Sequence, residues 1–179
     1  VIRSAPEYNV DDIIKELKKS SFTVSDLKET ERVKKSPLPF TTSTLQQEAA
    51  KSLNFSTQKT MRLAQGLYEG VAVKGRGTIG LITYLRTDST RISDDAKKMA
   101  HDYIEENYGA DYQAASEKKE KTNKKIQDAH EAIRPTYVEL TPAMVKDSLS
   151  RDHFRLYQLI WKRFTASRMS AAVYELSLI

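Results

Sequence analysis

The sequence of 179 residues contains no cysteine. Disulfide bonds and thiolate metal sites are therefore excluded, and the absence is consistent with a cytoplasmic protein. No apolar run is long enough to cross a bilayer, and the first residues show no signal peptide. We therefore expect neither a disulfide-stabilised protein nor one that spans a membrane.

The overall composition is ordinary for a soluble globular protein, with 39% hydrophobic and 30% charged residues. The formal net charge of +5 and the pI of about 9.2 favour a polyanionic partner, although many basic proteins bind no nucleic acid. The length suits one domain or slightly more. Because the chain starts on Val1 rather than methionine and stops on the strand-like residues 174–179, we expect a piece of a longer protein.

Helical signals dominate the chain. Ser43, with Gln46 three positions later, forms a capping-box pattern, and Ser56 and Ser93 can each cap a further helix. The helix pair at 43–69 resembles a helix-turn-helix, although such pairs are more often simple packing units. Together with the amphipathic N-terminal stretch, these signals predict helices over residues 10–20, 43–53, 57–69, 93–109 and 152–168. The proline after Thr141 predicts a further helix that begins at residue 142.

The predicted β structure is small. Residues 22–35 alternate as an exposed strand, and the prolines within residues 36–39 mark a break and a domain boundary. Residues 113–128 are polar and rich in lysine, which predicts a mobile loop. The expected fold class is therefore mainly α with small β parts.

The motif GLITYLRTDSTRIS, residues 80–93, places Tyr84, Arg86 and Asp88 at every second position. In a strand, Tyr84 and Arg86 would share one side with Ile82, while Leu81, Thr83 and Leu85 would face the core. A phenol, with a reference pKa near ~10, is a poor nucleophile at neutral pH. A nearby guanidinium favours the phenolate and can hold a phosphate. The pair suits attack on a phosphodiester, but a tyrosine in a strand is also ordinary packing.

A second motif, DAHEAIRPT, covers residues 128–136. On one helical turn, His130 and Arg134 would share a face, and Pro135 would end the turn. Histidine can exchange a proton near neutral pH, and arginine binds phosphate. The pattern alone favours a surface turn with an incidental ion pair through Glu131.

These two motifs, together with LPFTTSTLQQEAAKSLNFSTQKTMRLAQGLYEG at 38–70 and DHFRLYQLIWKRFTASRMSAA at 152–172, resemble the central part of a bacterial type IA DNA topoisomerase. The resemblance implies an ATP-independent enzyme that relaxes negatively supercoiled DNA by cutting one strand, passing the other through the gap and resealing it. Tyr84 matches the family nucleophile, which becomes joined to a 5′-phosphate. Arg86 matches the arginine that holds the scissile phosphate, and His130 the histidine that assists.

The remaining motif residues are assigned to DNA binding with less defined roles; they are Asp88, Thr90, Glu131 and Arg134. The resemblance also implies an Mg²⁺ cofactor in the full-length enzyme, bound by a Toprim domain of the same chain. No two aspartates here stand two apart, as the acidic cluster of that domain requires. We therefore expect no metal ligands in this fragment and no activity from the fragment alone.

The resemblance divides the chain into three parts. Residues 37–170 are expected to form the helical domain of the toroid, which carries the tyrosine and docks on Toprim. Residues 1–36 and 171–179 are expected to be pieces of a β-rich arch domain. The alternatives are a non-catalytic DNA-binding module on the same fold, a topoisomerase III, or the topoisomerase half of a reverse gyrase. A nucleoid-associated location in the cytoplasm accompanies the topoisomerase interpretation.

Overall fold

A computed structural model describes residues 9–114 and 130–178. Contacts within the chain divide it into two compact units, the first formed by Val1–Val33 with Val173–Ile179 and the second by Lys34–Ala172. The segment 113–128, predicted as a mobile loop, lies almost entirely outside the described residues. No helix in the described part of the chain is long and apolar enough to span a membrane.

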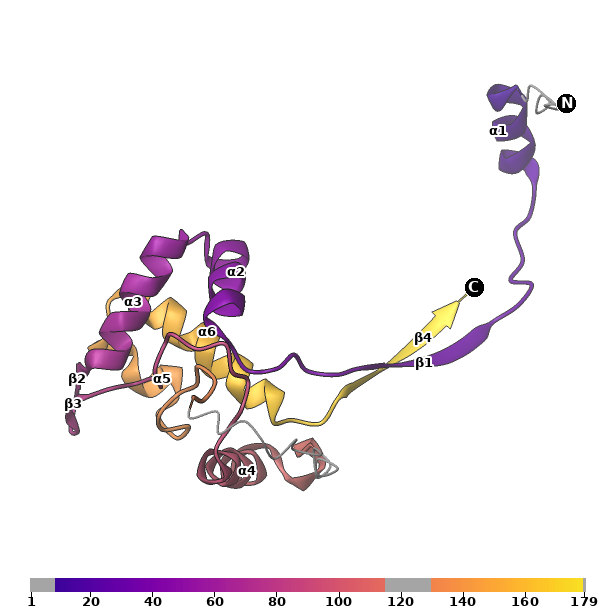
Figure 1. Cartoon of the computed structure of the whole chain (residues 1–179). Coiled ribbons are helices and arrows are strands. Elements are labelled where there is room, and N and C mark those ends of the chain that lie inside the picture. The colour runs from indigo at the N-terminus through magenta and orange to yellow at the C-terminus, as the bar shows by residue number, and fades with distance from the viewer. Residues whose placement is uncertain (1–8, 115–129, 179) are drawn as a thin grey trace, which may run out of the picture. The chain divides into compact units, whose positions relative to one another are not determined.

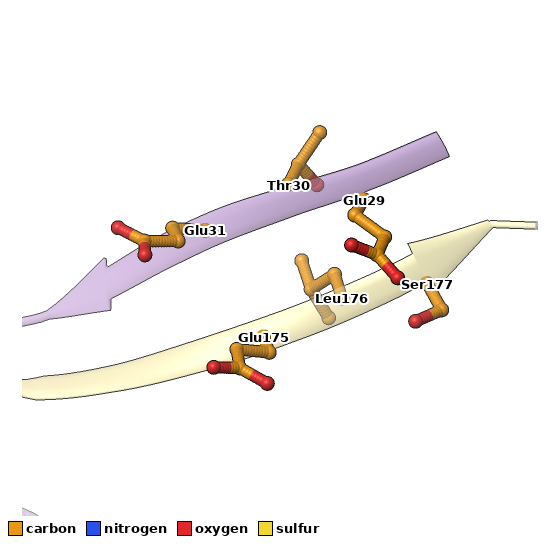
Figure 2. Close-up of a pocket in the computed structure, with 6 residues that line it drawn as sticks. All are labelled: Glu29, Thr30, Glu31, Glu175, Leu176 and Ser177. Carbon is orange, nitrogen blue, oxygen red and sulfur yellow. The ribbon is translucent and has the colours of Figure 1, made fainter. Parts of the chain in front are cut away.

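The first unit contains helix α1 (Val10–Lys19) and a two-stranded sheet of β1 (Lys28–Lys34) and β4 (Ala172–Leu178). Asn9 caps α1 by accepting a hydrogen bond from the Asp11 N–H at 3.1 Å. Figure 2 shows the two strands running in opposite directions. Glutamates from both strands line a pocket of about 350 Å³. The apolar side chains of α1 are exposed, as are all residues of β4.

The strand predicted for residues 22–35 is wrong in its first half. Residues 21–27 are not part of a strand, and the side chains of Phe22 and Val24 are 78% and 66% exposed. β1 begins only at Lys28, so residues 21–27 lie before the strand that pairs with β4. Alternating side chains alone do not form a strand when its backbone groups have no partner.

The second unit is a set of helices with one short hairpin (Figure 1). Its core is built around α6 (Arg151–Ser167), which contacts α2 (Thr42–Leu53), α3 (Thr57–Glu69) and α5 (Pro142–Val145). The apolar face of α6 is buried, apart from the half-buried Phe154. The remaining elements are β2 (Val71–Val73), β3 (Gly77–Ile79), α4 (Asp94–Tyr108), η1 (Ala110–Tyr112) and η2 (Lys146–Ser148).

The helix boundaries follow the capping signals. Ser56 and Ser93 accept backbone hydrogen bonds at the starts of α3 and α4, and Gly109 ends α4 with φ of +96°. The capping box of α2 begins two residues earlier than predicted: the pair is Thr41 and Thr44, not Ser43 and Gln46. Threonine at both positions allows each side chain to accept from the other's backbone N–H, so the earlier pair forms the box.

Two hydrogen bonds attach the loop before α5 to the core. The Tyr157 hydroxyl donates to the Leu140 carbonyl at 2.6 Å, and the Trp161 indole donates to the Val138 carbonyl at 2.8 Å. Burial raises the pKa of Tyr157, so this phenol remains a neutral donor. The prediction of a mainly α fold with small β parts is confirmed: the chain forms six α-helices in its described part and small antiparallel sheets.

Candidate active site

The segment that follows β3 carries the candidate nucleophile. Side-chain exposure alternates along it: Tyr84, Arg86, Asp88 and Thr90 are exposed, whereas Leu85, Thr87 and Ser89 are buried. The predicted alternation therefore holds from residue 84 to residue 90. It fails at Ile82, which is 2% exposed and does not share the side of Tyr84.

This segment bends at residues 83, 85 and 86 and is not the regular strand that was predicted. Its only strand-like pairing among the described residues is an isolated bridge between Ile82 and Pro135. Elsewhere its backbone groups bond to threonine side chains and to separate loops, which prevents a continuous ladder. The segment is held by tertiary contacts.

Close contact with α3 fixes the start of the segment. The Leu81 N–H donates to the Leu67 carbonyl at 2.8 Å. A Cβ atom on Gly80 would lie 2.6 Å from the Tyr68 carbonyl oxygen, too close for any side chain. Glycine is therefore required for the chain to pass this near to the end of α3.

Residues 130–136 lie alongside, joined to the segment through Thr83. The Thr83 N–H donates to the Arg134 carbonyl at 3.0 Å. The Thr83 hydroxyl donates to the Ala132 carbonyl at 2.7 Å and accepts from the Arg134 N–H at 3.0 Å. This arrangement brings His130 near Tyr84 although the two are far apart in sequence.

The helical turn predicted for His130 and Arg134 is wrong. The chain there is extended, with isolated bridges from Ile133 to Phe40 and from Pro135 to Ile82. His130 is exposed, whereas Arg134 is only 9% exposed. The short motif offered too few local hydrogen bonds for a helix, and pairing with distant segments prevailed.

Three aromatic rings meet at the candidate nucleophile. The Tyr84 ring lies edge-on to Tyr68 with centroids 5.5 Å apart, and its centroid is 6.4 Å from that of His130. Tyr84 is 44% exposed, so part of its surface is open to a ligand. The structure thus brings together two of the three predicted catalytic residues.

The third, Arg86, lines an open groove of about 490 Å³ beside the first turn of α2. Within the described part of the chain, its guanidinium has no ion-pair partner. An unpaired guanidinium in a groove can bind an anion such as phosphate with two parallel hydrogen bonds. The groove is lined by Thr41, Thr42, Ser43, Gln46, Arg86, Thr87, Asp88 and His130.

Glu131 and Arg134 face inward rather than towards the groove. Arg134 donates to one Glu131 oxygen from two nitrogens at 2.6 and 3.0 Å, and to the Pro135 carbonyl at 3.1 Å. The other Glu131 oxygen accepts from the Ser93 N–H at 2.7 Å. Burial alone would raise the pKa of Glu131, but the hydrogen bonds from Ser93 and Arg134 and the charge of Arg134 together lower it.

This ion pair joins the start of α4 to the segment that carries His130. Its geometry suits a supporting role behind the site, because the charge of Arg134 is already matched by Glu131. Direct contact of either residue with DNA stays a prediction.

Sequence reasoning missed the residues that α2 and α3 contribute. Thr42 lines the groove and bonds to the Tyr84 segment, and Tyr68 packs against the Tyr84 ring. The threonine-rich start of α2 was visible as a capping signal, but its contacts to residues 85–87 were not.

Comparison with known proteins gives a family for this arrangement. A family model described as DNA topoisomerase matches residues 3–179. The structure of full-length topoisomerase I from Thermotoga maritima matches with 43% sequence identity and a TM-score of 0.78. The match covers 98% of this chain and 28% of the Thermotoga chain. The chain belongs to the type IA DNA topoisomerase family.

Proposed function

We propose that this chain is the tyrosine-bearing part of a longer topoisomerase that cuts one strand of negatively supercoiled DNA and reseals it. The Tyr84 hydroxyl oxygen attacks a backbone phosphorus and loses its proton. The bond from that phosphorus to the 3′ oxygen breaks, which leaves a 5′-phosphotyrosine and a free 3′-hydroxyl. After strand passage, that hydroxyl attacks the phosphorus of the phosphotyrosine and loses its proton. The bond from phosphorus to the Tyr84 oxygen breaks, the phenol regains a proton, and the original phosphodiester bond is restored. The bond energy is conserved, so ATP is not consumed.

The observation that carries the proposal is that Arg86 and His130 line one groove while the exposed Tyr84 packs its ring beside His130. A phenol needs help to act as a nucleophile, because its reference pKa of ~10 leaves it protonated at neutral pH. Arg86 is proposed to hold the scissile phosphate and to stabilise the charge that develops on it. No other cation occupies this position among the groove-lining residues.

His130 is proposed to assist proton transfer or to position the phosphate. Its ring lies beside that of Tyr84, with the two centroids 6.4 Å apart, which is near enough for the imidazole to act on the groups that react there. Asp88 and Thr90 share the exposed side of Arg86 and are proposed to contact the DNA strand on either side of the cut. Glu131 and Arg134 are proposed to support His130 from behind.

The described residues include no group of three or more histidine or acidic side chains that could hold a metal ion. They therefore do not fit a magnesium site, and no step of the cleavage is assigned to a metal on this chain. We propose that Mg²⁺ is held by a Toprim domain elsewhere in the full-length protein. The helical second unit is then the domain that docks on Toprim, and the first unit belongs to the arch.

Trapping of the covalent adduct tests the proposal. The full-length enzyme is mixed with end-labelled single-stranded DNA, and denaturing gels show whether the label stays on the protein. Tyr84→Phe removes one oxygen, so it is expected to fold normally and to form no adduct. Tyr174→Phe, an equal change in the exposed strand β4, is the matched control and keeps the wild-type yield. A folded Tyr84→Phe enzyme that still forms the adduct would contradict the proposal. A wild-type enzyme that forms no adduct would instead favour a non-catalytic DNA-binding module.

A further inference from the structure

The side chain of Thr42 forms hydrogen bonds with the segment that carries Tyr84. Its hydroxyl donates to the Leu85 carbonyl at 2.7 Å and accepts from the Thr87 N–H at 2.9 Å. The Thr42 backbone N–H donates to the Thr87 carbonyl at 2.9 Å. One residue of α2 therefore holds the backbone on both sides of Arg86.

These contacts are not needed to start the helix. Thr41 and Thr44 already form the capping box of α2, and Thr42 is the first helical residue, where no side-chain hydrogen bond is required. A hydroxyl at this position therefore has no local function in the helix. Its bonds to Leu85 and Thr87 reach 43 and 45 positions along the chain.

Arg86 depends on these bonds because little else fixes its backbone. The segment has no strand partner at residues 83–90 among the described residues, and the guanidinium has no ion pair there. The side chains of Leu85 and Thr87 are buried, which anchors the segment but does not set the direction of the peptide groups around Arg86. Thr42 fixes that direction, because its hydroxyl bonds to the Leu85 carbonyl on one side of Arg86 and to the Thr87 N–H on the other.

We propose that Thr42 is a positioning residue for strand cleavage, which sets the place of Arg86 against the scissile phosphate. This inference rests on the proposed function, since it assumes that Arg86 holds the phosphate that Tyr84 attacks. A misplacement of about 1 Å in a catalytic group can slow a reaction about 100-fold, so loss of the hydroxyl is expected to reduce cleavage by about 10- to 100-fold.

The test measures single-turnover cleavage of a single-stranded oligonucleotide by the full-length enzyme, together with its dissociation constant. Thr42→Val is expected to cleave about 10- to 100-fold more slowly while binding the oligonucleotide within about twofold of wild type. Thr42→Ser keeps the hydroxyl and is expected to restore the rate to within about threefold. If Thr42→Val does not fold, Thr42→Ala removes the same hydroxyl from a smaller side chain.

Two comparisons separate positioning from general damage. Thr60→Val is the matched control, because Thr60 is buried in α3 and its hydroxyl donates only to the Ser56 carbonyl; it is expected to cleave at the wild-type rate. In an Arg86→Ala background, Thr42→Val is expected to add less than about twofold, since Thr42 acts through Arg86. Wild-type cleavage by Thr42→Val, an equal loss in Thr60→Val, or a full additional loss in the Arg86→Ala background would each overturn the inference. Absence of any adduct in the wild-type enzyme would instead refute the proposed function itself.

Discussion

Removal of the Arg134 guanidinium should destabilise the chain far more than removal of an ordinary surface cation. Arg134→Met keeps much of the side-chain length but loses two hydrogen bonds to Glu131, at 2.6 and 3.0 Å, and one to the Pro135 carbonyl. The Arg134 and Glu131 side chains are only 11% and 18% exposed, so water cannot fully replace the lost partner. Breaking a buried ion pair costs about 3–5 kcal/mol, and the partial exposure here places the expected loss near 3 kcal/mol.

The measurement is the free energy of unfolding from denaturant titration at neutral pH. Lys97→Met provides a matched control, because Lys97 and Asp94 form an ion pair of the same sequence spacing whose side chains are 40% and 97% exposed. That control is expected to change the free energy by about 0.5 kcal/mol or less. Losses of similar size in the two variants would refute the role assigned to the Arg134 ion pair.

The same pair predicts a pH dependence. The pKa of Glu131 lies below its ordinary value of 4.5 in the folded chain. The unfolded state therefore binds more protons than the folded state, and stability rises with pH through this window. The stabilising contribution is present above about pH 4.5 and declines as the pH falls through the folded pKa. In Arg134→Met the pKa of Glu131 should rise, and the decline in stability below pH 4.5 should weaken, as titrations at several pH values would reveal.

Three further predictions concern the site. Arg86→Ala in the full-length enzyme should lose a charge-assisted hold on the phosphate of about 1.5–3 kcal/mol, which corresponds to about 10- to 100-fold slower adduct formation; an unchanged rate would exclude Arg86 from the reaction. Gly80→Ala places a Cβ atom 2.6 Å from the Tyr68 carbonyl oxygen, so it should lower the free energy of unfolding by about 1–3 kcal/mol. Binding of single-stranded DNA should weaken steeply between low and high salt, because lysine and arginine contacts to phosphate release counterions; an affinity independent of salt would exclude this mode.

Local signals predicted the features that depend on local contacts. The starts of α3 and α4 followed from the Ser56 and Ser93 caps, and the helix predicted over residues 152–168 is α6. The exposed positions of Tyr84 and Arg86 followed from the alternation of an extended chain, with buried residues between them. These features need only neighbours within a few residues, so the sequence contains enough information to place them.

The features that failed depend on distant segments. Residues 130–134 suggested a helical turn, but bridges to Phe40 and Ile82 hold the chain extended. Thr42 gave no sign of a role in the site, because its partners lie 43 and 45 positions away. The predicted strand at residues 22–27 is absent because the paired strand β1 begins only at Lys28. Short periodic patterns do not report such tertiary pairing.

Peptide mapping of the trapped adduct tests the assignment of the nucleophile most directly. The full-length enzyme is trapped on DNA, the DNA is digested to a short remnant, and tryptic peptides are identified by mass spectrometry. Cleavage after Arg76 and Arg86 yields a peptide of residues 77–86 in which Tyr84 is the only tyrosine. The neighbouring Tyr68 falls in a separate peptide of residues 63–74. We expect the nucleotide remnant on the peptide of residues 77–86; its presence on the peptide of residues 63–74, or on any other, would contradict the assignment of Tyr84.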